Sequence, residues 1–184
     1  MKQADDAEER TLGKGNYLHL VERHGWEFVH RFGCSGVVVI VAVTPDDRLL
    51  LVEQYRPAVG NRVIELPAGL VGDTAEWSGE ALGDAAHREL IEETGWQAAS
   101  MVPLAESPTA VGLSSERLTF FEARDLTKVG PGGGDHTEDI KVHEVPRTAL
   151  ATFLATKRRE GLLVDYKIFA GLYLAEAGTA PTRG

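Results

Sequence analysis

The sequence contains one cysteine, no long apolar run and no block of basic residues, and each absence excludes a class of protein. The lone Cys34 cannot form an intramolecular disulfide, and the acidic, polar start does not resemble a signal peptide, so we expect a cytoplasmic location. The longest aliphatic run, 37–43, is far shorter than the roughly 20 residues of a membrane-spanning helix. Asp and Glu number 28 against 19 Lys and Arg, and the resulting charge of −9 repels nucleic acid. We therefore expect neither a membrane nor a nucleic acid as a partner.

What remains is the composition of an ordinary globular protein, with 43% apolar and 26% charged residues in a chain of 184. We expect a mobile arm over 1–13, an N-terminal β-hairpin region over 14–35, the main domain over 36–178 and a tail over 179–184. In the hairpin region two β-type runs flank His24-Gly25, which is a two-residue turn signal. Because an isolated hairpin is only marginally stable, this region must pack on the main domain or on a second subunit.

The main domain alternates between strand-like and helix-like patterns. The continuous β-branched run 37–43 predicts a strand that is buried on both faces. Further strands are expected over 49–54, 62–66, 101–105, 117–122 and 139–145, and helices over 79–94, 147–160 and 165–177. Gly95 is placed to end the first of these helices. The mixture predicts an α/β layered fold with a mixed sheet.

The helix expected over 79–94 carries acidic residues on its apolar side. At about 100° per residue, Glu89 and Glu93 fall inside the arc marked by its leucines and alanines, and Glu92 falls at the edge of that arc. Buried carboxylates without a counter-ion are very costly, and like charges four residues apart repel each other. A divalent cation would remove both costs. Closely placed carboxylates form a hard oxygen site, which favours Mg²⁺ or Mn²⁺ over Zn²⁺.

The motif around this helix resembles a known family. Glu80 is followed, after seven residues, by the run RELIEETGW at 88–96, which resembles the Nudix box G-x5-E-x7-REU-x-EE-x-GU, where U is a bulky apolar residue. The segments QYRP at 54–57 and ELPAG at 65–69 resemble the branch of ADP-ribose and nucleoside-diphosphate-sugar pyrophosphatases. The resemblance implies a Nudix-type α/β/α sandwich with a mixed sheet and a small N-terminal antiparallel β-hairpin region.

The resemblance also implies roles for individual residues. Metal ligands would come from the backbone carbonyl of Ala68 and from Glu89, Glu92 and Glu93. Arg88 would hold a box carboxylate in place, although the helix wheel alone equally allows a surface arginine paired with Asp84. The general base would be Glu138, because the related branch takes this base from a loop that precedes a late strand. The catalytic set is then Glu138, Glu92 and Arg88, with Mg²⁺ or Mn²⁺ as cofactor.

One feature departs from the family pattern. Ten residues instead of five separate Gly69 from Glu80, so the box contains a five-residue insertion that includes Trp77. The role of Glu80 is therefore left open.

Candidate substrate contacts follow from the same resemblance. They are Arg56 near the diphosphate, Glu65 in the ELPAG segment, Glu116 in the SSER segment at 114–117, and the aromatic residues Trp26 and Phe28 of the hairpin. In relatives an aromatic residue of this hairpin stacks on the base, often from the other subunit, so we expect a homodimer formed through the hairpin.

The activity implied is Mg²⁺-dependent hydrolysis of the pyrophosphate bond of a nucleoside diphosphate sugar such as ADP-ribose, giving a nucleoside monophosphate and a sugar phosphate. A GDP-mannose-type hydrolase is the nearest alternative, because base and sugar preference depend on loops. An isopentenyl diphosphate isomerase and an RNA cap hydrolase fit less well, given one cysteine and an acidic surface. From another class, the chain could be a non-catalytic nucleotide-sugar sensor, although such sensors usually lose box carboxylates, which are all present here.

Overall fold

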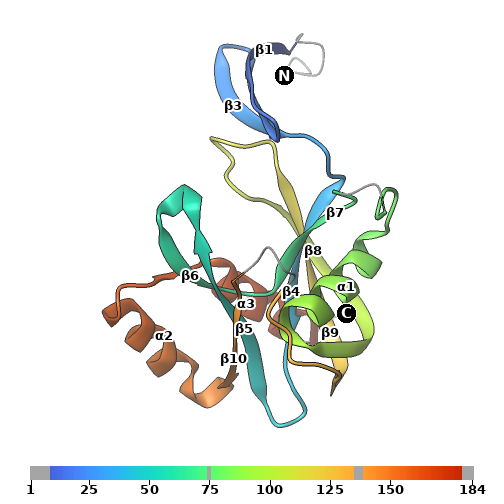
Figure 1. Ribbon diagram of the computed structural model, residues 1–184, viewed down its shortest axis with the longest axis vertical. Coiled ribbons are helices and arrows are strands. Elements are labelled where there is room, and N and C mark those ends of the chain that lie inside the picture. Colours follow the sequence, from blue (N-terminus) through green and yellow to red (C-terminus); the bar gives the residue numbers. More distant parts are fainter. Residues whose placement is uncertain (1–8, 74–75, 135–138, 180–184) are drawn as a thin grey trace, which may run out of the picture.

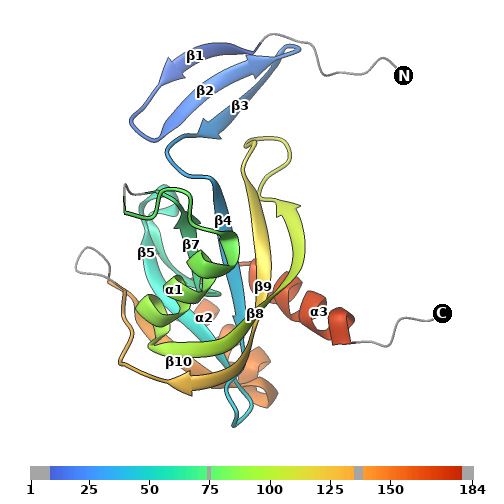
Figure 2. The same cartoon turned by 90° about the vertical axis from the view of Figure 1, so that its right-hand side faces the viewer.

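The computed structural model describes residues 9–73, 76–134 and 139–179, and its strands form three sheets (Figure 1). The first sheet stands at one end of the molecule and contains three antiparallel strands, β1 (Arg10–Lys14), β2 (Leu18–Arg23) and β3 (Trp26–Arg31). Figure 2 shows that the connection from β3 to β4 joins it to the rest of the chain. The sheet therefore extends away from the main body instead of entering its core.

This N-terminal sheet is larger than the predicted hairpin. The expectation that 10–13 lacks regular structure is wrong, because these residues belong to β1. Arg10 lies opposite Glu22 in the register and forms an ion pair with it at 2.7 Å, which stabilises the added strand. The predicted turn is confirmed, since His24 and Gly25 both have positive φ, 56° and 76°, as a two-residue hairpin turn requires.

Two four-stranded sheets form the main body. One has the order β7-β4-β9-β8, made by Ala68–Val71, Gly36–Ala42, Arg117–Lys128 and Trp96–Pro108. The other has the order β10-β5-β6-β11, made by Lys141–Pro146, Arg48–Arg56, Asn61–Glu65 and Leu163–Val164. Both sheets are mixed, because β4 pairs in parallel with β9 and β6 pairs in parallel with β11.

In the described part of the chain, three α-helices complete the layers: α1 (Leu82–Thr94), α2 (Leu150–Arg159) and α3 (Lys167–Thr179). Figure 2 shows α1 and α3 on opposite sides of β4 and β9. Alternate residues of β4 enter two different apolar clusters, Val38 and Ile40 facing α1, and Val39 and Val41 facing the second sheet and α3. The strand is buried on both faces, as its β-branched run predicts, and the α/β/α fold with mixed sheets is confirmed. Within the described ranges, no helix combines the length and apolar character needed to cross a membrane.

The boundaries of several elements differ from the prediction. The first main-domain helix begins at Leu82, because Gly79 has a φ of 83° and lies in a turn before it. Strands β8 and β9 are longer than expected because they pair with each other over most of their length. The short strands β7 and β11 have no sequence signal of their own and exist through pairing with β4 and β6. Gly95 ends α1 with a φ of 70°, as expected.

Candidate active site

Helix α1 distributes its three box carboxylates across the boundary between core and solvent. Glu93 is buried at 3% exposure, the Glu89 side chain is 14% exposed, and the Glu92 side chain is 44% exposed. This order of exposure agrees with the helix wheel, which places Glu93 and Glu89 inside the apolar arc and Glu92 at its edge. The helix thus presents Glu89 and Glu93 toward strand β7.

Strand β7 meets these carboxylates with its backbone. The amide of Ala68 donates a hydrogen bond of 3.0 Å to Oε2 of Glu93. The next residue, Gly69, lies so close to the helix that a Cβ atom built on it would be 1.9 Å from Cδ of Glu89. Glycine at this position therefore leaves room for the Glu89 carboxylate, which a larger residue would displace.

Arg88 binds all three neighbouring acids of the motif. Its Nε and Nη2 atoms donate to the carboxylate of Glu80 at 3.0 and 3.1 Å, and Nη1 donates to Glu89 at 2.9 Å and to Glu92 at 3.1 Å. A second hydrogen of Nη2 reaches the carbonyl of Leu70 at 3.4 Å. These five hydrogen bonds use all five N–H donors of the guanidinium, so Asp84 is not its partner. Burial alone would lower the pKa of Arg88. The carboxylates of Glu80 and Glu89 have the larger combined effect, so the pKa of Arg88 is raised above its ordinary value.

A cavity of about 340 Å³ opens beside Glu89 and Gly69. Its walls carry three cationic side chains from elements far apart in the sequence, Arg31 of β3, Arg56 of β5 and Lys167 of α3. They also carry four acidic side chains, Asp73, Glu65, Glu89 and Glu116. The cavity thus combines hard oxygen donors with guanidinium and ammonium groups, which is the chemistry that a metal-bound diphosphate requires.

Each cation of the cavity is held by an acid. Arg56 donates to Glu65 at 2.7 Å and Arg31 donates to Glu116 at 2.6 Å, while Lys167 pairs with Asp165. Burial raises the pKa of Glu65, and the charge of Arg56 opposes that shift. The pairs fix the positions of the three cations before any ligand enters, which lowers the ordering cost of binding.

Several predicted site residues meet at this cavity and others do not. Arg56, Glu65, Ala68, Glu89 and Glu116 all line it. Trp26 and Phe28 are not among its lining residues. Trp26 donates from Nε1 to the carbonyl of Gly112 at 3.2 Å, and Phe28 packs under Arg23. Glu138 lies outside the described residues.

Two of the three cations that line the cavity, Arg31 and Lys167, are absent from the sequence prediction. Neither belongs to a motif, and the fold brings them together from the N-terminal sheet and the last helix. A nearby acidic partner in the sequence could have pointed to Arg31, but its partner Glu116 is distant from it in the chain.

The donor set fits a divalent cation, although its carboxylates are engaged with other groups. Among residues 9–73, 76–134 and 139–179, no three His, Cys, Asp or Glu side chains are grouped so as to hold a metal ion. Instead, Arg88 is the counter-ion of Glu89 and Glu92, and the Ala68 amide binds Glu93. Three carboxylates, Glu89, Glu92 and Glu93, nevertheless lie on α1, and carboxylate oxygens are hard donors that suit a hard divalent cation better than a soft metal.

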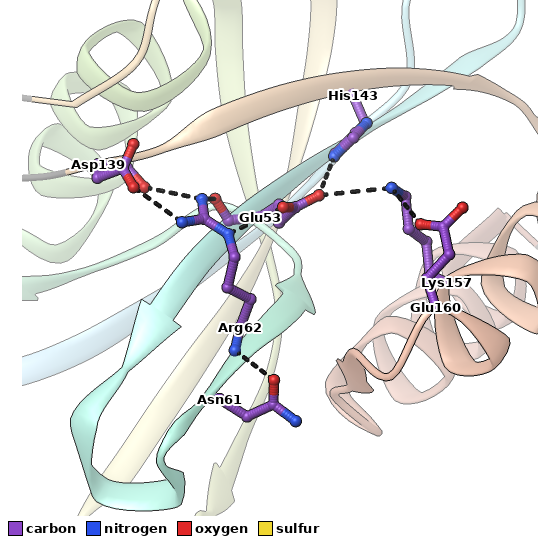
Figure 3. Close-up of polar contacts among 7 residues, drawn as sticks. All are labelled: Glu53, Asn61, Arg62, Asp139, His143, Lys157 and Glu160. Atoms are coloured by element: carbon purple, nitrogen blue, oxygen red, sulfur yellow. Dashed lines mark hydrogen bonds and ion pairs between the residues drawn. The ribbon is translucent and has the colours of Figure 1, made fainter.

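A second buried polar cluster lies on the other sheet (Figure 3). Glu53 of β5 accepts hydrogen bonds of 2.9 Å from both Arg62 and His143, and the Nζ atom of Lys157 lies 3.6 Å away. Arg62 also donates to Asp139 at 2.8 Å. Burial raises the pKa of Glu53, but its hydrogen bonds hold that pKa below the ordinary value. Burial in turn lowers the pKa of His143. The cluster joins β5, β6, β10 and α2 and shares no residue with the cavity.

Comparison with known proteins places this geometry in a family. The chain is 38% identical over 112 residues to an ADP-ribose pyrophosphatase of Mycobacterium tuberculosis, a match that covers 61% of this chain and 51% of that relative. It is 32% identical over 144 residues to a GDP-mannose pyrophosphatase of Citrobacter koseri, covering 72% of each. The chain thus spans about half the length of the first of these relatives.

A solved structure described as an ADP compounds hydrolase shares the fold, with a TM-score of 0.68, 21% sequence identity, and coverage of 92% of this chain and 90% of that one. The family model of the NUDIX domain matches residues 35–163, which include the strands β4 to β10 and the box helix. The chain therefore belongs to the NUDIX domain family.

Proposed function

We propose that this chain hydrolyses the pyrophosphate bond of a nucleoside diphosphate sugar such as ADP-ribose, and releases a nucleoside monophosphate and a sugar phosphate. One observation carries the proposal: the box carboxylate Glu89 and the cations Arg31, Arg56 and Lys167 line the same cavity. The names of relatives with this domain, ADP-ribose and GDP-mannose pyrophosphatases, support the same reaction class. We assign the activity to 36–178 and keep the cytoplasmic location as a prediction.

Nudix pyrophosphatases generally need a divalent metal ion, and we propose that this chain uses Mg²⁺ or Mn²⁺. The groups that would hold it are Glu89, Glu92, Glu93 and the carbonyl of Ala68. When bound, such an ion neutralises phosphate charge and lowers the pKa of a coordinated water. Arg88 would release part of its hold on Glu89 and Glu92 while it remains fixed by Glu80.

The cations on the cavity wall would bind and orient the substrate. A guanidinium offers two parallel donors to a phosphate, so Arg56 and Arg31 suit the non-bridging oxygens of a diphosphate. Their acidic partners Glu65 and Glu116 keep them oriented before the substrate arrives. General base catalysis by Glu138 stays a prediction, because this residue lies outside the described part of the chain.

We propose further that the chain forms a homodimer through its N-terminal sheet. That sheet exposes apolar side chains, among them Leu18 and Leu20, and Trp26 is 62% exposed. Trp26 and Phe28 are absent from the cavity of their own chain, so stacking on the base would require a second subunit. Sedimentation velocity at micromolar concentration should give a dimer, and L18E/L20E should give a monomer. A monomeric parent protein would overturn this assembly.

A GDP-mannose-type specificity is the second candidate, favoured by the match to a GDP-mannose pyrophosphatase over 72% of both chains. The two candidates share every step of the chemistry and differ only in the base and the sugar. They are therefore separated by the substrate panel below and not by mutation of the box.

The deciding experiment is a substrate panel with Mg²⁺, in which monophosphate release is followed from ADP-ribose, GDP-mannose, UDP-glucose, NADH, diadenosine polyphosphates and capped RNA. We expect turnover of a nucleoside diphosphate sugar and a loss of at least about a hundredfold for E93Q, since metal-site electrostatics carry much of such catalysis. No turnover of any diphosphate, with E93Q behaving like the parent, would contradict an enzymatic function. Binding of a nucleotide sugar without turnover would instead favour the sensor.

A further inference from the structure

The five-residue insertion in the Nudix box brings an aromatic ring onto the arginine of the motif. The guanidinium of Arg88 lies over the Trp77 ring, with Cζ of the arginine 5.0 Å from the ring centroid. The Arg88 side chain is only 14% exposed, so this contact is largely shielded from water. A cation over an indole face is attracted by the ring quadrupole, and the attraction grows as the pair loses solvent.

The same turn supplies two groups to Arg88. The carbonyl of Trp77 accepts a hydrogen bond of 3.0 Å from the amide of Glu80, which closes the turn between them. Glu80 then binds the edge of the guanidinium through both carboxylate oxygens, while the Trp77 ring packs against the same group. The inserted segment therefore contacts the arginine of the motif directly through Trp77.

Edge and face contacts restrict different motions of Arg88. The five hydrogen bonds lie around the edge of the guanidinium and use every donor, so no further hydrogen bond can fix its plane. A tilt out of the plane would lengthen the bonds from Nη1 to Glu89 and Glu92 together. The Trp77 ring, which packs against the guanidinium, opposes that tilt. Trp77 is therefore well placed to hold the guanidinium of Arg88 in its orientation.

We propose that Trp77 is a positioning residue for the metal site, acting through Arg88 on the carboxylates of Glu89 and Glu92. The inference rests on the proposed function, because it takes these two carboxylates as metal ligands. Groups that orient metal ligands from outside the coordination sphere commonly change metal affinity by about tenfold or more. Trp77 contacts Arg88 and not the carboxylates themselves. We therefore expect it to change the affinity for the metal ion more than the rate of the chemical step.

The test measures Mn²⁺ affinity directly, from the electron paramagnetic resonance signal of free Mn²⁺, with W77F and W77L. Phenylalanine keeps an aromatic face, and leucine keeps bulk without one. We expect W77L to raise the dissociation constant for Mn²⁺ by about fivefold and W77F to stay within about twofold of the parent. At saturating Mg²⁺, W77L should retain a kcat within about twofold of the parent, because the defect is in metal binding.

A matched control is F169L, which removes another aromatic ring under an arginine, because Phe169 of α3 lies under Arg158 of α2. It should bind Mn²⁺ as the parent does. If W77L binds Mn²⁺ with the parent's affinity, Trp77 has no positioning role and the hydrolase proposal stands. If W77F and W77L weaken binding equally, the aromatic face is not what positions Arg88, and the proposed role of Trp77 is wrong. If the parent protein binds no Mn²⁺ and cleaves no diphosphate, the proposed function itself is wrong and this inference falls with it.

Discussion

Arg88 and Glu80 form a two-point ion pair, with Nε to Oε1 at 3.0 Å and Nη2 to Oε2 at 3.1 Å. The two side chains are 14% and 7% exposed, so the pair is shielded from solvent. Glu80 precedes α1, which means that the pair connects the turn before the helix to the middle of the helix. Despite the insertion, Glu80 therefore has a defined place in the motif, as the anchor of its arginine.

The first prediction concerns this anchor. E80Q removes the charge from one end of a shielded pair and leaves Arg88 with a neutral partner. We expect the free energy of unfolding in urea at neutral pH to fall by about 2 kcal/mol, the usual range for a shielded hydrogen bond to a charged group. The fold should persist, because Glu89 and Glu92 still bind Arg88.

The control for E80Q is E106Q, which changes the acid of an exposed pair. Arg117 and Glu106 are 75% and 56% exposed in their side chains. Exposed pairs of this kind contribute less than about 1 kcal/mol, so E106Q should be close to the parent. Equal effects of E80Q and E106Q would show that Glu80 does not anchor Arg88.

Helical periodicity was sufficient to predict the acidic face of the site. A wheel at 3.6 residues per turn separates Glu93, which is buried, from Glu92, which is largely exposed, because position on a helix fixes direction toward the core. The run at β4 was equally informative, since a strand between two layers has no polar face. These features depend on residues close together in the chain.

The cationic wall of the cavity could not be predicted in this way. Arg31 and Lys167 lie near opposite ends of the chain, and only the tertiary fold brings both to the cavity. Trp77 shows the same limit, because a tryptophan in an inserted loop has no periodicity that points to Arg88. Strand β1 could not be predicted for a related reason, because its residues are all exposed and its pairing depends on β2.

A second prediction concerns pH and the cluster of Figure 3. Burial lowers the pKa of His143 below its ordinary value of 6.5, against the opposing influence of Glu53 and with support from Lys157 and Lys141. Below pH 6.5 the unfolded chain therefore binds a proton that the folded chain does not. The free energy of unfolding should decrease as pH falls through this window, and level off below the folded pKa. H143Q should flatten the decrease in urea titrations between pH 7 and about 5. An unchanged slope in H143Q would contradict this assignment.

A third prediction separates charge from geometry at the cavity wall. R56K keeps the positive charge but loses the planar fork that binds Glu65 at 2.7 Å. We expect kcat/KM for the preferred nucleotide sugar to fall by about tenfold or more, because a guanidinium can offer a phosphate two parallel donors and an ammonium group cannot. R124K, at an exposed pair with Glu122 that does not line the cavity, should keep the parent's kinetics. Similar kinetics in R56K and the parent would remove Arg56 from substrate binding.

The fourth prediction uses the close approach of β7 to α1. In G69A the new methyl carbon would lie 1.9 Å from Cδ and 2.1 Å from Oε1 of Glu89. The obstacle is the end of a flexible side chain, so the Glu89 carboxylate should move away while both backbones stay in place. We therefore expect a folded protein, less stable by about 1–2 kcal/mol, that has lost most of its Mn²⁺ affinity and its turnover.

Gly83 gives the matching control, because it lies in the first turn of the same helix and its added methyl would only touch Phe121 at 3.9 Å. G83A should retain activity and gain up to about 1 kcal/mol, since alanine favours the helix over glycine. The pair distinguishes displacement of Glu89 from a general effect of added bulk near α1. If G69A binds Mn²⁺ as tightly as G83A, the position of Glu89 against β7 does not matter for metal binding. Glu92 and Glu93 would then have to supply that affinity without it.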